Sequence, residues 1–258
     1  MVDCSKWVLK VTQAESRLLS NHRVAAASRI VQARLLAVAL MLRAFSEKDE
    51  YRVLKVWENV TFRVFGLGRF DARQKVGDYV RLAWSVANKG LTPDAVIKEL
   101  RKIGSEPEFS IGSVVQNLFN TDCYKDWAEE LRYFFCRYEE HLARKAGQKI
   151  NEGMWNRIWE SEPSKSIEHI FPQSKGSDTP TTSGVYVHRL GNLVMLPPGV
   201  NSKLQDISAR QKAETYAEQG LLQAIEVSKL LDGRRWNRAA IKSREKSLMR
   251  WARKEWGS

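Results

Sequence analysis

The stretch that decides the fold reads SIEHIFPQ at residues 166–173. Apolar side chains stand on both sides of Glu168 and His169, and Pro172 follows them. This pattern predicts a short strand that ends at the proline, which cannot donate a hydrogen bond to a sheet. Neighbouring strand residues point to opposite faces, so Glu168 and His169 reach one site only if the strand ends or twists there.

A second strand and a short helix are predicted after this stretch. The sequence HRLGNLVML at residues 188–196 ends in an apolar run that is typical of a strand. The Pro-Gly-Val sequence at residues 198–200 can then open a short helix that carries Asn201 and Lys203. The predicted order is therefore strand, loop, strand, helix.

The chain before this stretch is predicted to be helical. Over residues 126–142, large apolar side chains recur at spacings of three and four, which places them on one helix face. Thr92, followed by a proline, is typical of a helix start, and Gly104 is typical of the end of the same helix. We expect a helical domain over residues 1–150 and a second domain over residues 151–258.

The composition favours a polyanionic partner. The 258 residues include 42 Lys and Arg against 30 Asp and Glu, which gives a formal net charge of +12. Such an excess is typical of proteins that bind nucleic acid. Nine basic and two acidic residues lie within 234–256, interleaved with tryptophans. Either this segment is a helix that packs its tryptophans and solvates its charges, or it also lays those charges along a phosphate backbone.

Several classes of protein are excluded. The longest apolar run, residues 35–42, is far shorter than the roughly 20 residues that span a bilayer. The N-terminus shows no basic start, apolar core and small-residue cleavage site, so we expect a cytoplasmic protein. Cys4, Cys123 and Cys136 are odd in number and lack the spacing of a zinc knuckle, which argues against disulfides and structural zinc.

The motifs together resemble a known nuclease family. The Glu-His-Ile-x-Pro-Gln sequence, the later His-Arg-Leu-Gly-Asn-Leu and the final Asn-x-Lys-Leu are similar to the ββα-metal finger of HNH (His-Me finger) nucleases. They resemble most closely the C-terminal nuclease domain of GmrSD-type restriction endonucleases, a family that includes phosphorothioation-linked defence nucleases. The resemblance covers about residues 160–210. It implies a mainly α fold with a small ββα-metal finger, in which a helical N-terminal domain precedes an HNH nuclease domain with a basic C-terminal helix.

The resemblance implies a role for each motif residue. His169 is expected to be the general base, and Asn192 to brace the loop between the strands. Glu168 and Asn201 are expected to bind one divalent cation, Mg²⁺ or Mn²⁺. The chemistry favours these residue types, because phosphodiester hydrolysis needs a water that is deprotonated near neutral pH, and because hard oxygen ligands suit Mg²⁺.

A structural alternative stands beside each assignment. A histidine at a strand end commonly donates to a backbone carbonyl, Asn192 after a glycine can be a turn residue, and Asn201 can cap a helix. For His188 we favour a structural role over a phosphate contact. Many HNH nucleases have Asp where this chain has Glu168, which leaves open whether Glu168 binds the cation directly or only supports its ligands.

Duplex DNA is the substrate that the resemblance implies, nicked or cut through both strands in a bacterial defence or restriction system. The basic side chains expected to hold its backbone are Lys203, Arg189, Arg234, Arg235 and Arg238. Relatives commonly begin with a nucleotide-dependent ParB-like domain whose motifs are not seen here, so such a domain or subunit is an expected partner. Two alternatives stay open: a DNA-binding or partner-binding module with an inactive finger, and an HNH nuclease that acts on RNA.

Overall fold

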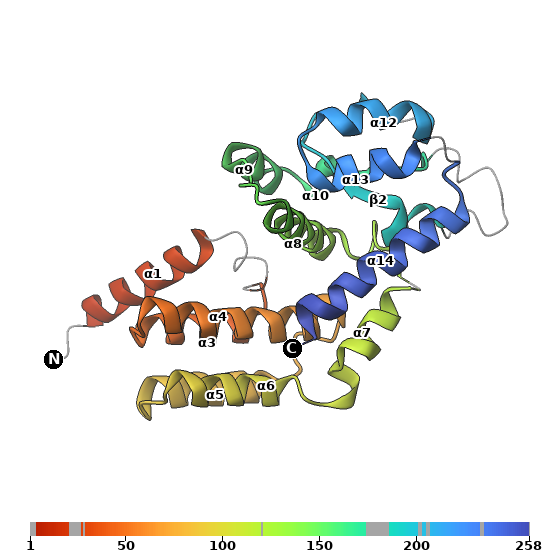
Figure 1. Cartoon of the computed structure of the whole chain (residues 1–258). Coiled ribbons are helices and arrows are strands. Elements are labelled where there is room, and N and C mark those ends of the chain that lie inside the picture. The colour runs from red at the N-terminus through yellow and green to blue at the C-terminus, as the bar shows by residue number, and fades with distance from the viewer. Residues whose placement is uncertain are drawn as a thin grey trace. The chain divides into compact units, whose positions relative to one another are not determined.

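The computed structural model describes residues 4–20, 27, 29–119, 121–173, 186–200, 203–204, 207–232 and 235–257. These residues are mainly helical and contain one small antiparallel sheet of two strands, so the predicted mainly α class is confirmed at this level (Figure 1). The chain forms two compact units, unit 1 with Met1–Asn117 and Ala252–Ser258, and unit 2 with Leu118–Trp251. Within the described ranges, no helix combines the length and the apolar character that crossing a bilayer requires.

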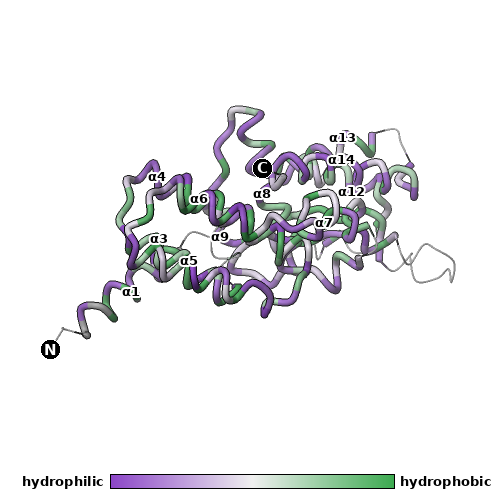
Figure 2. The backbone as a smooth tube through the Cα atoms, turned by 90° about the horizontal axis from the view of Figure 1, so that it is seen from below, coloured by the Kyte–Doolittle hydropathy of each residue, from purple (hydrophilic) through white to green (hydrophobic). Residues whose placement is uncertain are grey.

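Unit 1 is built from helices. Its elements are α1 (Cys4–Ser20), α3 (Val31–Leu42), α4 (Glu47–Thr61), the π-helix η1 (Phe62–Leu67), α5 (Val76–Asn88), α6 (Pro93–Ile103), the 3₁₀ helix η2 (Pro107–Phe109) and nearly all of α7 (Ile111–Leu118). Hydrophobic and hydrophilic residues alternate along α4 and α6, as expected of helices with one buried face (Figure 2). Trp57 of α4 is fully buried, and its indole Nε1 donates to the Ala33 carbonyl oxygen at 2.8 Å.

The boundaries of α6 follow the local sequence. The Thr92 hydroxyl accepts a hydrogen bond from the Ala95 backbone N–H at 3.3 Å, and Pro93 occupies the first helical position. Gly104 follows the last residue of the helix. The predicted start and end of this helix are therefore confirmed.

Unit 2 contains the sheet and the helices around it. Its elements are α8 (Ala128–Ala146), α9 (Glu152–Glu160), α10 (Pro163–Ser166), β1 (Ile167–His169), the 3₁₀ helix η4 (Leu190–Asn192), β2 (Leu193–Met195), α12 (Ala209–Glu218), α13 (Leu222–Leu231) and most of α14 (Arg238–Trp256). Helices α8 and α13 both contact β2, and α12 packs on α13. The sheet therefore lies against helices that are distant from it in sequence.

Helix α8 confirms the apolar stripe predicted over residues 126–142. Leu131, Phe134 and Phe135 of this stripe have no exposed surface, and Cys136 beside them is 1% exposed. The compact units divide after Asn117, so this helix belongs to unit 2. The predicted domain boundary lies at residue 150.

The two predicted strands are confirmed, each shorter than its apolar run. Strand β1 pairs antiparallel with β2, with Ile167 opposite Met195 and His169 opposite Leu193. All six strand residues are buried. The N–H of Ile170 donates to the Asn192 carbonyl oxygen at 2.9 Å, just beyond the last strand pair. His169 therefore stands at the end of β1, as the proline at position 172 led us to expect.

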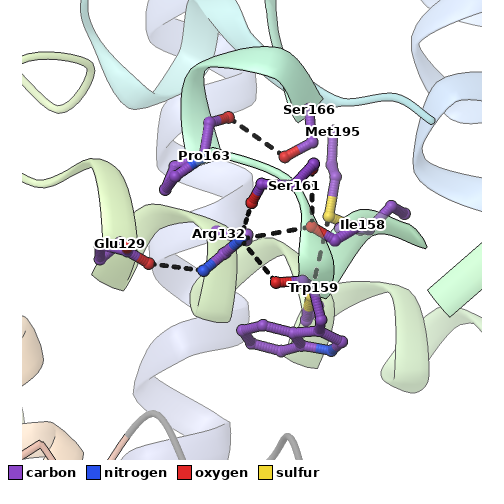
Figure 3. Close-up of polar contacts among 9 residues, drawn as sticks. Glu129, Arg132, Ile158, Trp159, Ser161, Pro163, Ser166 and Met195 are labelled. Atoms are coloured by element: carbon purple, nitrogen blue, oxygen red, sulfur yellow. Dashed lines mark hydrogen bonds and ion pairs between the residues drawn. The ribbon is translucent and has the colours of Figure 1, made fainter. Parts of the chain in front are cut away.

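One arginine fixes the segment that leads into β1. Arg132 of α8 donates through Nη2 to the Glu129 carboxylate at 2.7 Å. Its Nη1 atom donates to three carbonyl oxygens at the end of α9, those of Ile158, Trp159 and Ser161, at 3.3, 3.2 and 2.6 Å (Figure 3). Because the last carbonyls of a helix have no partner within it, the guanidinium caps α9. The entry to α10 and β1 is thereby anchored to α8.

Candidate active site

The candidate active site centres on His169, the last residue of β1. Its imidazole Nε2 lies 3.0 Å from Nδ1 of His188, within hydrogen-bonding distance. The Tyr124 ring meets His169 edge to face, with ring centroids 4.4 Å apart, and stacks on His188 at 5.6 Å and 13°. These three rings, Tyr124, His169 and His188, form what we call the three-ring cluster. The cluster brings together residues from three separate parts of the sequence.

Both imidazoles of the cluster are held in the neutral form. Burial is the main cause that lowers the pKa of His169, to about 3, and the nearby His188 and Lys212 act in the same direction. Burial also lowers the pKa of His188, against the opposing effect of the Asp122 carboxylate. At neutral pH the two facing nitrogens therefore share one proton, and one ring donates while the other accepts.

Glu168 precedes His169 in β1, and neighbouring side chains of a strand alternate between its two faces. Its carboxylate forms an ion pair with the ammonium of Lys212 from α12, and the two side chains are 5% and 1% exposed. Lys212 Nζ also donates to the carbonyl oxygen of His169 at 2.7 Å. Burial raises the pKa of Glu168, whereas the charge of Lys212 lowers it. Both residues of the Glu-His pair are thus held by one buried lysine.

The fit of a divalent cation depends on the donors that the site presents. In the described part of the chain, no three His, Cys, Asp or Glu side chains gather into a group that could hold a metal ion. The charge of Glu168 is compensated by Lys212. Asn201, the second predicted ligand, lies outside the described residues. One carboxylate and one amide still fit Mg²⁺ by donor type, because Mg²⁺ keeps several waters and binds few protein ligands.

Asn192 connects three segments through its side-chain amide. Its Oδ1 accepts from the backbone N–H of Phe171 at 2.8 Å and from the indole Nε1 of Trp236 at 2.9 Å. Its Nδ2 donates to the carbonyl oxygens of Val187 and Phe171 at 2.8 and 3.2 Å. The residue has no exposed surface. The end of β1, the turn before η4 and the segment before α14 therefore meet at one amide.

Arg189 forms an ion pair within unit 2. Its Nε lies 3.1 Å from Oε1 of Glu245 in α14, and Nη2 contacts the second carboxylate oxygen. The side chains of Arg189 and Glu245 are 13% and 1% exposed. This bidentate pair ties the turn before η4 to α14.

Exposed basic side chains gather around Tyr186. The Arg238 guanidinium carbon lies 4.5 Å from the centroid of the Tyr186 ring, and Lys242 Nζ lies 5.5 Å from it. A hydrogen bond from Lys242 lowers the pKa of the Tyr186 phenol, with further contributions from the charges of Lys242, Arg238 and Arg189. Arg238 and Lys242 are both exposed. We call Tyr186, Arg238 and Lys242 the cationic patch.

The other side chains predicted to contact phosphate are Lys203, Arg234 and Arg235. Lys203 and Arg235 are exposed, and Arg234 lies outside the described residues. Lys203 donates its backbone N–H to the Val200 carbonyl oxygen at 3.0 Å, and residues 198–200 form turns. The predicted short helix at this place therefore falls partly on residues that the structure does not describe.

A family model described as GmrSD restriction endonucleases, C-terminal domain, matches residues 112–251. The chain belongs to this family. The match covers more than half of the chain and includes the whole of unit 2, with both strands and the three-ring cluster. No match is found among curated proteins or solved structures. Membership of the GmrSD C-terminal domain family implies a restriction nuclease role and a DNA substrate.

Two residues of this GmrSD C-terminal domain were missed by sequence reasoning. Lys212 lies four residues before the buried Tyr216, so it falls on the buried face of α12, a spacing that could have identified it. Tyr124 lies between α7 and α8, in a polar segment without periodicity, and no sequence signal indicates its contact with His169.

Proposed function

We propose that the chain is an HNH-type endonuclease that hydrolyses phosphodiester bonds of duplex DNA in a bacterial restriction or defence system. One observation carries this proposal: a buried, neutral imidazole, that of His169, stands at the end of a two-stranded antiparallel sheet in a member of the GmrSD family. We take the two strands and the segment that follows them as the ββα-metal finger. A neutral imidazole is the form of histidine that can accept a proton from water.

The contact with His188 supports Nδ1 of His169 as the nitrogen that accepts the proton. Nε2 faces His188, so Nδ1 remains for the attacking water. In the proposed step the proton of the water passes to Nδ1, the water oxygen bonds to phosphorus, and the ester bond to the sugar oxygen breaks. The phosphate anion of the substrate raises the pKa of a neighbouring imidazole, which strengthens the base when DNA is bound.

A bound Mg²⁺ or Mn²⁺ ion supplies the charge that stabilises the developing negative charge on the phosphate oxygens. Asn201 and the Glu168 carboxylate are the residues that would hold it. Because Lys212 already compensates the charge of Glu168, we expect Asn201 to contribute more to cation affinity.

The nucleic acid is expected to lie along the basic side chains near the site. Tyr186 of the cationic patch lies two residues before His188 in the chain, and Arg238 and Lys242 contact its ring. Exposed cations of this kind bind the phosphate backbone without reading bases. Lys203, Arg235 and Arg234 are proposed as further backbone contacts. Because Arg189 already forms an ion pair with Glu245, we expect it to contribute least of these six basic residues.

A plasmid assay tests the function. Supercoiled DNA is incubated with the full chain, with Mg²⁺ or with a chelator, and nicked and linear products are quantified. His169→Ala is expected to lose about 100-fold or more of the rate, the contribution typical of a general base. His141→Ala, a histidine of α8 outside the site, is the control and keeps the wild-type rate. Equal rates for His169→Ala and the wild type would overturn the assignment.

Two other results would point to the alternatives. An inactive finger predicts that DNA binding survives the removal of Mg²⁺ and that no divalent cation yields cleavage. A nuclease for RNA predicts that structured RNA competes with duplex DNA and is degraded faster. Fluorescence anisotropy and gel assays on the same preparation separate these outcomes.

A further inference from the structure

We propose that His188 is a positioning residue that fixes the tautomer and the orientation of His169, an inference that rests on the proposed nuclease function. The contact that carries it joins His188 Nδ1 to His169 Nε2 at 3.0 Å. A histidine in a motif region is often only structural, yet this one contacts the proposed base directly.

The surroundings of His188 hold its ring in one place. Its carbonyl oxygen accepts from the Cys123 backbone N–H at 3.0 Å, and the Asn192 amide holds the preceding carbonyl, that of Val187, at 2.8 Å. The ring itself stacks on Tyr124 with an interplanar angle of 13°. Nδ1 of His188 is therefore presented to His169 by fixed backbone and by a stacked ring.

The direction of this hydrogen bond decides whether His169 can act as a base. If His169 donates from Nε2, its Nδ1 carries the lone pair and can accept a proton from water. If His169 accepts at Nε2, its Nδ1 carries the proton and cannot. The proposed chemistry therefore requires His188 to be the acceptor, and a residue without an acceptor at this place leaves the tautomer of His169 unfixed.

Two substitutions separate the acceptor from the ring. His188→Asn places a carboxamide oxygen close to the position of Nδ1, whereas His188→Leu fills the space without an acceptor. We expect His188→Leu to lower kcat about 10- to 100-fold, as for other partners that orient a functional imidazole, with KM changed less than about twofold. His188→Asn should retain most of kcat. His141→Leu, which removes a histidine outside the site, controls for the general effect of the change.

A spectroscopic measurement tests the inference without activity. Nitrogen-15 NMR of the full chain reports the tautomer of each histidine. The proposal predicts the Nε2–H tautomer for His169 in the wild type and in His188→Asn, and a mixture of tautomers in His188→Leu. A folded wild type without nuclease activity refutes the proposed function, while the NMR result still decides the positioning role.

Three results would overturn the positioning role. The first is an Nδ1–H tautomer of His169 in the wild type. The second is full activity of His188→Leu. The third is an equal loss of kcat in His188→Asn and His188→Leu while both variants remain folded, because the acceptor would then have no influence.

Discussion

The side-chain ammonium of Lys212 lies 2.7 Å from the carbonyl oxygen of His169 and forms an ion pair with the carboxylate of Glu168. The lysine comes from α12 and is buried. The Lys212 ammonium thus binds the backbone of His169, the proposed base, and compensates the charge of Glu168. A buried charge is stable only when its partner is present.

Removal of this ammonium should be strongly destabilising. Lys212→Met leaves Glu168 buried without a cation, and we expect a loss of about 3 to 5 kcal/mol in the free energy of unfolding. Urea unfolding followed by circular dichroism measures it. Lys229→Met, which replaces an exposed lysine of α13, should change stability little. A Lys212→Met variant as stable as the wild type would contradict the ion pair.

Asn192→Ala should weaken the site and the fold together. The substitution removes four hydrogen bonds and leaves the buried indole N–H of Trp236 and two backbone groups of Phe171 without their partner. We expect a loss of about 2 to 4 kcal/mol, since unpaired buried polar groups are costly. Thermal unfolding detects it as a lower Tm. An unchanged Tm would show that water replaces the amide.

Gly191→Ala tests the close packing between η4 and α14. A Cβ at this position would lie 2.1 Å from the carbonyl oxygen of Ile241, so the helix has to move. We expect a loss of more than about 2 kcal/mol. Gly112→Ala in α7 is the matched control, because nothing lies within 4 Å of its Cβ, and it should stabilise by about 0.5 kcal/mol. Equal denaturant midpoints for Gly191→Ala and Gly112→Ala would contradict the close packing of Gly191 against α14.

The low pKa of His169 predicts a specific loss of stability in acid. The folded pKa is about 3, below the ordinary value of 6.5. Between these values the unfolded chain binds more protons than the folded one, so stability falls as the pH is lowered from 6.5 towards 3. At pH 5 this amounts to about 2 kcal/mol.

His169→Asn isolates this contribution from that of other titrating groups. Guanidinium unfolding of both proteins at pH 7 and pH 5, without added divalent cation, gives the difference. The variant should lose less stability than the wild type over this interval. Parallel losses would place the pKa of His169 near its ordinary value.

Local features of the sequence predicted the helix starts and the strands. Thr92 caps α6, and Ser208 and Gln211 form the capping box of α12, because a cap involves residues only three apart. Apolar runs beside Glu168 and before Pro197 predicted β1 and β2 for the same reason, since strand patterns are read within a few residues.

Contacts between distant residues could not be predicted in this way. Lys212 lies 44 residues from Glu168, and His188 lies 19 residues from His169 across a loop. A lysine in a polar helix is normally exposed. The spacing of Lys212 from Tyr216 places it on the buried face of α12, but that spacing does not indicate that Glu168 is its partner. The three-ring cluster likewise depends on where the segment before α8 meets the end of β1.

Chemical modification of Cys136 would report on the opening of this GmrSD C-terminal domain. Its thiol is 1% exposed and lies 3.7 Å from the sulfur of Met195 in β2, and burial raises its pKa. Alkylating reagents need an accessible thiolate, so they modify Cys136 only when α8 separates from the strand that pairs with β1. Mass spectrometry of the peptide that contains Cys136 measures the alkylation rate. This rate would therefore report how often α8 separates from the sheet that carries the proposed base.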